Sequence, residues 1–193
     1  FGTPEWEVLD LMHREVHRHY GFRWDWKMIH TTASVPGPQS AADHGGSMML
    51  GAVCGYDSFS PGGMLALDEV YSPAQLVMDA DILAHTERVA RGAWSGEGLE
   101  PEALARLVDE VVADGESFIS HETTVANMRG QYHAPRVLKR RNRTQWEAAG
   151  RPMEVAAAQA EADRLVASYS FEPPREVMRD LRAIYERAKE RLG

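Results

Sequence analysis

The chain has 193 residues, of which 44% are hydrophobic and 26% are charged, and its formal net charge is -8. This composition is typical of a globular protein, and the negative charge argues against nucleic-acid binding. The single cysteine excludes a disulfide framework and a cysteine-rich zinc site. No apolar run approaches the roughly 20 residues that a membrane span needs, so we expect a cytoplasmic protein that does not enter membranes.

The first segment carries a strong helix signal. Thr3 and Pro4 stand where a helix cap and a first helical position are expected, and Glu5 and Glu7 follow in the first turn. Apolar side chains then recur at helical spacing, which predicts an amphipathic helix over residues 4–19. Because the chain starts at Phe1 and enters this helix almost at once, we expect it to be truncated at its N-terminus.

Strand and helix signals alternate over the next hundred residues. Ser72-Pro73-Ala74-Gln75 has the pattern of a capping box, which predicts a helix that runs to about Arg91. The other predicted elements are, in order, a strand at 26–31, a loop at 32–38, a helix at 39–54, a strand at 56–60, a turn at 61–63, a loop at 64–71, a linker at 93–100, a helix around 104–112 and a third strand at 117–119.

The last third of the chain shows only helix signals. We predict three helices there, one that opens near residues 120–124, one along 155–169 and one along 177–192. Alternation of strands and helices implies parallel βα units, and a complete (β/α)8 barrel needs about 250 residues. We therefore predict an α/β fold in which residues 1–125 form the last three βα units of a TIM barrel. Residues 126–193 would be a helical extension packed on that barrel.

Function in such a barrel lies where the strands end. His30 and Thr31 follow the first predicted strand, Asp68 and Glu69 lie in the loop after the second, and His121 follows the third. The histidines could bind a ligand or move protons, and the carboxylates could hold a cation or act as a base. The alternatives are that the histidines only hold loops by hydrogen bonds and that the carboxylates lie in a solvated loop. Thr124, with its neighbour, is equally suited to cap the following helix.

Other chemistry-bearing patterns are weaker. Trp24 and Trp26 could form an aromatic box for a quaternary ammonium group, although core packing is the simpler interpretation. Residues 136–143 hold five basic side chains. The first interpretation is a solvated helix face, the second is a docking patch for an acidic partner, and the third is contact with RNA. The sequence contains no H-E-x-x-H zinc motif, no G-x-S-x-G elbow and no P-loop.

An ordered series of segments resembles a known family. The series includes His121-Glu122-Thr123-Thr124, the sequence WEAAG at 146–150, Gln75-Leu76-Val77 within 71–92, and SVPGPQSAADHGGSMMLGAVCGYDSFSPGGML upstream. Together they resemble the C-terminal part of the trimethylamine methyltransferase (MttB-like) family. No single motif is specific, but the series covers nearly the whole chain in order.

That resemblance implies a TIM barrel that transfers a methyl group from a methylated amine to the cobalt of a corrinoid (cobalamin) carried by a separate partner protein, with no metal bound directly. The family's pyrrolysine would fall within residues 30–34, where this chain has only standard residues, so the resemblance favours a betaine-like quaternary amine such as glycine betaine. The substrate-binding residues we expect are His30, Thr31, Asp68, Glu69 and His121, with Gln39 and Thr124 in support. No side chain of the chain itself is expected to act as a catalytic nucleophile.

Two other functions stay open. The chain could be a non-catalytic fragment or paralogue that binds a partner, since half a barrel lacks part of its site and exposes sheet edges. It could also be another cytosolic TIM-barrel enzyme. Self-association into a homo-oligomer is left undecided by the sequence, and we expect no nucleic-acid partner.

Overall fold

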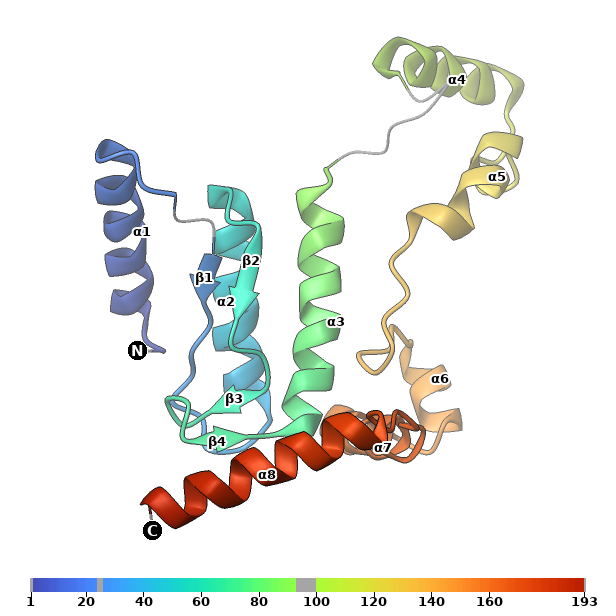
Figure 1. Ribbon diagram of the computed structural model, residues 1–193. Coiled ribbons are helices and arrows are strands. Elements are labelled where there is room, and N and C mark those ends of the chain that lie inside the picture. Colours follow the sequence, from blue (N-terminus) through green and yellow to red (C-terminus); the bar gives the residue numbers. More distant parts are fainter. Residues whose placement is uncertain (1, 24–25, 93–99, 193) are drawn as a thin grey trace. The chain divides into compact units, whose positions relative to one another are not determined.

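The computed structural model describes residues 2–23, 26–92 and 100–192 (Figure 1). The chain forms two compact units, Phe1–Ala162 and Asp163–Gly193. This division concerns compactness alone, so the predicted domain boundary after residue 125 stays a prediction. The tryptophan expected at position 24 and most of the linker expected at 93–100 lie outside the described residues.

The first helix is confirmed. Helix α1 spans Pro4–His19, with Thr3 at its N-cap and Pro4 in its first turn. It brings acidic side chains to a buried lysine, because Nζ of Lys27 lies 2.7 Å from a carboxylate oxygen of Glu7 and 2.9 Å from one of Asp10. Lys27 has no exposed surface, so its charge depends on these two partners.

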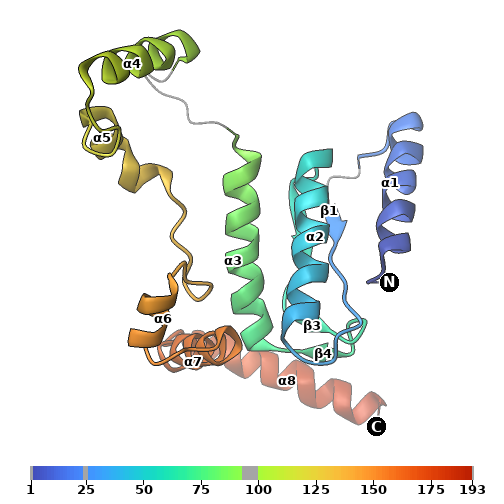
Figure 2. The same cartoon turned by 180° about the vertical axis from the view of Figure 1, so that it is seen from behind.

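The predicted parallel βα unit is confirmed. Strand β1 (Trp26–Met28) pairs in parallel with strand β2 (Ser58–Ser60), and helix α2 (Pro38–Cys54) makes the crossover between them. Helix α2 lies beside the two strands in both Figure 1 and Figure 2. Gly51 allows this close approach, since a Cβ there would stand 2.6 Å from the ring of Phe59.

The third predicted strand is wrong. Residues 117–119 form a turn, closed by a hydrogen bond from the amide of Ser120 to the carbonyl of Ser117. Phe118 is 44% exposed and Ile119 is 81% exposed, so this short apolar run has no layer to bury it. The described residues therefore contain one pair of parallel strands within a helix-rich chain. That is compatible with part of an α/β fold, and a TIM barrel is not shown.

The loop expected at 64–71 contains a small antiparallel ribbon. Strand β3 (Met64–Leu65) pairs with strand β4 (Val70–Tyr71) in the register Met64 to Tyr71 and Leu65 to Val70. The turn between these strands carries Asp68 and Glu69, which gives both predicted site residues a defined backbone.

Helix α3 (Pro73–Ala90) is confirmed with its cap. The side chain of Ser72 accepts a hydrogen bond from the amide of Gln75 at 3.2 Å. Only half of the predicted capping box forms, because the Gln75 side chain is turned into a buried polar network instead. Helix α3 packs against α2, where a Cβ on Gly45 would lie 3.6 Å from Ile82.

Four helices follow the turn at 117–120, where three were predicted. The unexpected one is the six-residue helix α6, which Asn142 caps by accepting from the amide of Gln145. The helices of this part of the chain are α4 (Pro101–Asp114), which precedes the turn, and α5 (Glu122–Gln131), α6 (Arg143–Ala148), α7 (Glu154–Ala167) and α8 (Arg175–Leu192), which follow it.

The basic stretch at 136–143 is not the helix face that we expected. Residues 136–142 are irregular, and Asp81 of α3 holds them by accepting hydrogen bonds from the amides of Arg136, Val137 and Leu138 at 2.7–3.0 Å. These three amides point at one carboxylate, so they are unavailable for helical bonds. Val137 thereby joins a small core formed with Ala74, Met78 and Ala158.

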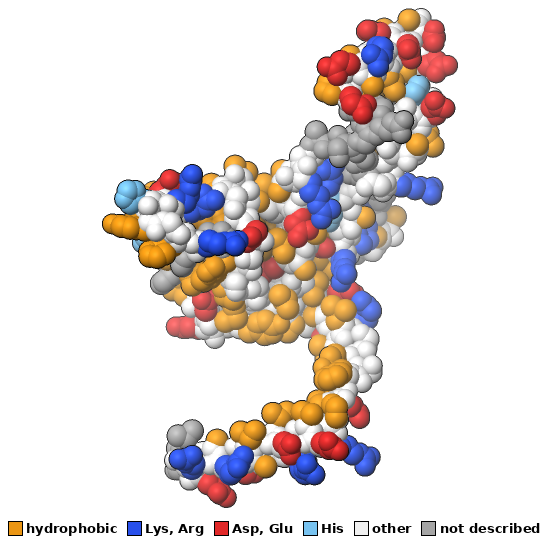
Figure 3. Space-filling model, turned by 45° about the horizontal axis from the view of Figure 1, so that its top comes forward, with side chains coloured by type: hydrophobic (Ala, Val, Ile, Leu, Met, Phe, Trp, Pro, Cys, Tyr) orange, Lys and Arg blue, Asp and Glu red, His pale blue; other side chains and the backbone are white. Residues whose placement is uncertain are grey.

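The second unit contains the amphipathic helix α8. Figure 3 shows it at the bottom of the view, with hydrophobic side chains along one side and charged side chains along the other. The apolar side includes Val177, Leu181 and Ile184, each about half exposed. Over the whole described chain, no helix is both long enough and apolar enough to span a membrane.

Candidate functional site

The carboxyl end of β1 places His30 against Asp68. Nδ1 of His30 lies 3.2 Å from Oδ2 and 3.3 Å from Oδ1 of Asp68, which comes from the turn between β3 and β4. The His30 side chain is only 3% exposed, whereas the Asp68 side chain is 38% exposed. A buried ring thus orients a carboxylate that remains open to solvent.

Asp68 sits on an unusual backbone turn. Ala66, Leu67 and Asp68 have φ angles of 50°, 57° and 72°, so three consecutive non-glycine residues are left-handed. Each such residue costs about 1–2 kcal/mol relative to its ordinary conformation. Strain of this kind persists only where surrounding contacts enforce it, and it gathers at functional sites.

Backbone hydrogen bonds enforce this turn. The amide of Ala66 donates to the carbonyl of Ala33 at 2.8 Å, and the amide of Leu67 donates to the carbonyl of Thr31 at 3.0 Å. The loop after β1 and the loop after β2 are therefore joined directly. The carboxyl ends of the two parallel strands share one polar surface as a result.

The side chain of Thr31 also stabilises the loop after β1. Its hydroxyl donates to a carboxylate oxygen of Asp43 on α2 at 2.7 Å and accepts from the amide of Ala33 at 3.0 Å. Thr31 is 1% exposed. The hydroxyl is engaged inside the protein, so the geometry assigns Thr31 to support of the loop, and its contact with substrate stays a prediction.

Glu69 and Gln39 lie at the rim. Glu69 follows Asp68 and is exposed, with its amide donating to the carbonyl of Ala66. The side-chain amide of Gln39, in the first turn of α2, donates to the hydroxyl of Thr32 at 2.9 Å. Gln39 thus links the loop after β1 to the start of the helix, and its supporting role at the site stays a prediction.

His121 and Thr124 belong to a different local structure. His121 is the N-cap of α5, and its Nδ1 accepts from the amide of Thr123 at 3.3 Å. Thr124 lies in the first turn of the same helix and is half-buried. The hydrogen bond recorded for His121 is local, whereas His30, Thr31 and the Asp68 turn are directly bonded into one structure.

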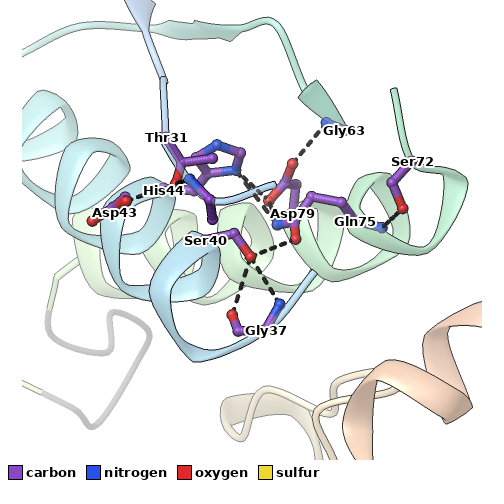
Figure 4. A network of polar contacts seen from close by, with 10 residues as sticks. Thr31, Gly37, Ser40, Asp43, His44, Gly63, Ser72, Gln75 and Asp79 are labelled. Atoms are coloured by element: carbon purple, nitrogen blue, oxygen red, sulfur yellow. Dashed lines mark hydrogen bonds and ion pairs between the residues drawn. The ribbon is translucent and has the colours of Figure 1, made fainter. Parts of the chain in front are cut away.

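A buried polar network beneath this surface was missed by the sequence analysis (Figure 4). On α2, the Ser40 hydroxyl donates to the Gln75 side chain at 2.8 Å, and His44 Nδ1 lies 2.8 Å from Asp79 Oδ1. Gln75 also donates to Asp79 at 2.7 Å within α3. The signal was present in the sequence, since Ser40 and His44 are four residues apart on a helix rich in small residues, as are Gln75 and Asp79 on the next helix.

The network fixes the loop after β2. Oδ2 of Asp79 accepts from the amide of Gly63 at 2.7 Å, immediately before β3. Asp79 is 3% exposed, and Ser40, His44 and Gln75 have no exposed surface. A carboxylate this deep is stable only with several donors, and Asp79 has three. The Asp79 carboxylate thus attaches the start of the β3–β4 ribbon, whose turn carries Asp68, to helix α3.

The surface around Asp68 carries two adjacent acidic side chains and lies next to an aromatic ring. Asp68 and Glu69 supply two neighbouring carboxylates on an enforced turn. Trp6 of α1 touches the His30 ring edge-on, with ring centroids 6.1 Å apart. Among the residues that the structure describes, no three histidine, cysteine or acidic side chains are grouped to hold a metal ion.

Comparisons with known proteins extend over the whole chain. The sequence model of the family described as "Trimethylamine methyltransferase (MTTB)" matches residues 1–193. A trimethylamine methyltransferase of Desulfitobacterium hafniense is 29% identical over 193 residues, which are 100% of this chain and 38% of the relative. Trimethylamine methyltransferases of Methanosarcina mazei and Methanosarcina barkeri are 25% and 24% identical over 97% of this chain and 37% of each relative. This chain therefore spans less than two fifths of the length of these relatives.

Proposed function

Because this chain belongs to the trimethylamine methyltransferase family, we propose that it forms the cation-recognising part of an enzyme that removes a methyl group from a methylated amine. The proposed donor is a quaternary or tertiary methylated amine, with betaine-like compounds such as glycine betaine preferred. The proposed acceptor is the cobalt of a corrinoid carried by a separate protein. Family membership supports the reaction class, and the residues at the strand ends support the kind of substrate.

The chemistry asks little of protein side chains as reactants. The carbon–nitrogen bond breaks and a carbon–cobalt bond forms, with the electron pair for the new bond coming from reduced cobalt(I). The nitrogen of a quaternary donor keeps the pair of the broken bond and leaves as a neutral amine, so no proton is needed. The protein must bind the cation, orient one methyl group and exclude water.

The observation that carries the proposal is the display of Asp68 on three left-handed residues. The hydrogen bonds that the amides of Ala66 and Leu67 donate to the loop after β1 hold the turn, and the His30 ring contacts the carboxylate while leaving it 38% exposed. A unit charge about 4 Å away in a partly solvated site is attracted by about 4 kcal/mol. A quaternary ammonium has no proton to donate, so a preset carboxylate gives attraction without demanding a hydrogen bond.

Neighbouring groups extend the same recognition. Glu69 adds a second negative charge beside Asp68, and a tryptophan face attracts an ammonium group by about 0.5–2 kcal/mol. Trp6 of α1 is the aromatic side chain we assign to this contact, because its ring lies edge-on to the His30 ring, with centroids 6.1 Å apart. Quaternary and tertiary methylated amines satisfy both kinds of contact.

The corrinoid partner needs a docking surface. Exposed Lys139, Arg141 and Arg143 form a basic edge that we assign to an acidic protein surface. Replacing Arg141 and Arg143 with glutamate should slow methyl transfer to a corrinoid protein while leaving transfer to free cob(I)alamin unchanged. Equal rates with the corrinoid protein before and after replacement would rule this docking edge out.

The substrate part is tested by calorimetric titration of the chain with glycine betaine, tetramethylammonium and trimethylamine. Asp68→Asn should weaken binding at least about tenfold, since tenfold corresponds to about 1.4 kcal/mol, well within the attraction of one carboxylate. Glu102→Gln removes the same charge from an exposed position on α4 and should leave the affinity unchanged. Equal weakening by both variants would reduce Asp68 to a contribution to net charge and contradict the proposed site.

A further inference from the structure

A second pocket lies away from the strand ends. It is formed by α2, α3 and the irregular segment that Asp81 holds, and its volume is about 250 Å³. Three basic side chains line it, namely His85 of α3, His133 just before the segment, and Arg140 within the segment. This volume is well above the roughly 10–15 Å³ that one water molecule requires, so a small organic molecule fits.

The contact between Arg140 and His85 determines which hydrogen-bond donors this pocket offers. Nη2 of Arg140 lies 3.0 Å from Nδ1 of His85. A guanidinium can only donate, so Nδ1 of His85 must accept and the ring proton must be on Nε2. Arg140 has further N–H groups besides the one given to His85. Both side chains therefore offer hydrogen-bond donors.

His133 adds a third polar group that is not yet satisfied. Its Nε2 is buried, and within the described part of the chain it has no hydrogen-bond partner. Its ring meets the His85 ring edge-on, with centroids 6.4 Å apart. A buried ring nitrogen without a partner costs free energy, which a bound acceptor would recover.

Acceptors are scarce around these donors. The carboxylate of Asp81 also lines the pocket and keeps its negative charge, but its oxygens already accept from the three backbone amides of residues 136–138. The remaining wall is largely apolar and includes Ala41, Ile82 and Leu138. Apolar walls with a few converging polar groups are the usual composition of a ligand site.

We propose that this pocket binds the oxyanion group, carboxylate or phosphate, of a small organic anion. Arg140 supplies the permanent charge, His85 Nε2–H and His133 Nε2 supply the converging hydrogen bonds, and the apolar wall takes the carbon part of the ligand. The pocket contains no residue of β1 or β2, so it is a separate site from the surface around Asp68. Its failure would leave the proposed methyl transfer untouched.

The test follows the imidazole Cε1–H signals of the full chain by NMR during titration with sodium propionate and, separately, inorganic phosphate at constant ionic strength. Saturable shifts of the His85 and His133 signals are expected. Tighter binding of propionate would identify a carboxylate as the natural group, and tighter binding of phosphate would identify a phosphate. Absence of saturation with both probes, or equal shifts with sodium chloride, would overturn the site.

Matched variants separate a built site from general attraction to positive charge. Arg140→Gln should weaken binding at least about tenfold, as expected for losing a charged hydrogen bond of about 1.5–3 kcal/mol. Arg141→Gln removes the same charge from the next residue, which does not line the pocket, and should leave the affinity for both probes unchanged. His85→Phe, at an exposed position, should weaken binding without unfolding the chain. Equal losses in the Arg140 and Arg141 variants, with unchanged backbone amide spectra, would contradict the proposal.

Discussion

Nδ1 of His44 lies 2.8 Å from Oδ1 of Asp79, in a contact between α2 and α3 from which solvent is excluded. The two helices follow successive parallel strands, so this single bond joins consecutive βα units. Through Gly63, the same carboxylate also sets the start of the loop that carries Asp68. The proposed binding surface therefore depends on a buried network one layer beneath it.

Removing this carboxylate should be costly. Asp79→Ala leaves the amide of Gly63 and the side chains of His44 and Gln75 without their shared acceptor, so we expect a loss of about 3–5 kcal/mol in unfolding free energy. Urea unfolding followed by circular dichroism measures it. Glu15→Gln, which breaks an exposed pair with Arg18 at 3.1 Å, is the control and should cost less than about 1 kcal/mol. Similar midpoints for both variants would show that the network contributes little.

Asp81 should make the free energy of unfolding depend on pH in the acidic range. Burial alone would raise the pKa of this carboxyl, but the amides of residues 136–138 and the nearby His133 outweigh it and hold the pKa below its ordinary value of 3.8. The folded state thus favours the charged form, and its contribution is full above about pH 4. That contribution is lost as the pH falls through the folded pKa.

This pH dependence is measured by comparing the unfolding free energies of the wild type and Asp81→Asn between pH 7 and pH 3. The difference between them should be of the order of 1.5–3 kcal/mol at neutral pH and should shrink as the solution becomes more acidic. A difference that stays constant, or grows, on acidification would mean that the backbone amides do not stabilise the charged carboxylate.

Two glycines of α2 should respond oppositely to the same substitution. Gly51→Ala would place a Cβ 2.6 Å from the ring of Phe59 and 2.7 Å from Cδ of Lys27, so we expect a loss of about 1–3 kcal/mol from overpacking. Gly46→Ala meets nothing within 4 Å and should gain about 0.5–1 kcal/mol, because alanine is the better helix former. Thermal unfolding of both variants checks this pair, and a stable Gly51 variant would show that α2 does not lie so close to β2.

Local signals made much of the fold predictable. Helices α1, α2 and α3 lie where periodicity and the Ser72 cap indicated, and the parallel pairing of β1 with β2 followed from strand and helix alternation. The strand predicted at 117–119 was wrong because a short apolar run has the same sequence pattern whether it is buried in a sheet or exposed. Only tertiary contacts distinguish the two cases.

The candidate site was predictable in part for a similar reason. Position after a strand was enough to indicate His30 and Asp68, which the structure brings within 3.2 Å of each other. The strained turn that contains Asp68 could not be predicted, since Ala66 and Leu67 carry no left-handed signal and their hydrogen bonds to the carbonyls of residues 33 and 31 impose it. The role of Asp81 was hidden as well, because its partners are backbone amides 55–57 residues away.

The central claim is tested most directly by methyl transfer to free cob(I)alamin, followed by absorbance, for the protein encoded by the complete reading frame that contains this sequence. The donors are glycine betaine, carnitine, proline betaine, choline and trimethylamine. We expect methylcobalamin to form with one of the quaternary amines and Asp68→Asn to slow its formation at subsaturating donor by at least about tenfold. No methylation with any donor, from a protein shown to be folded, would contradict the proposed function.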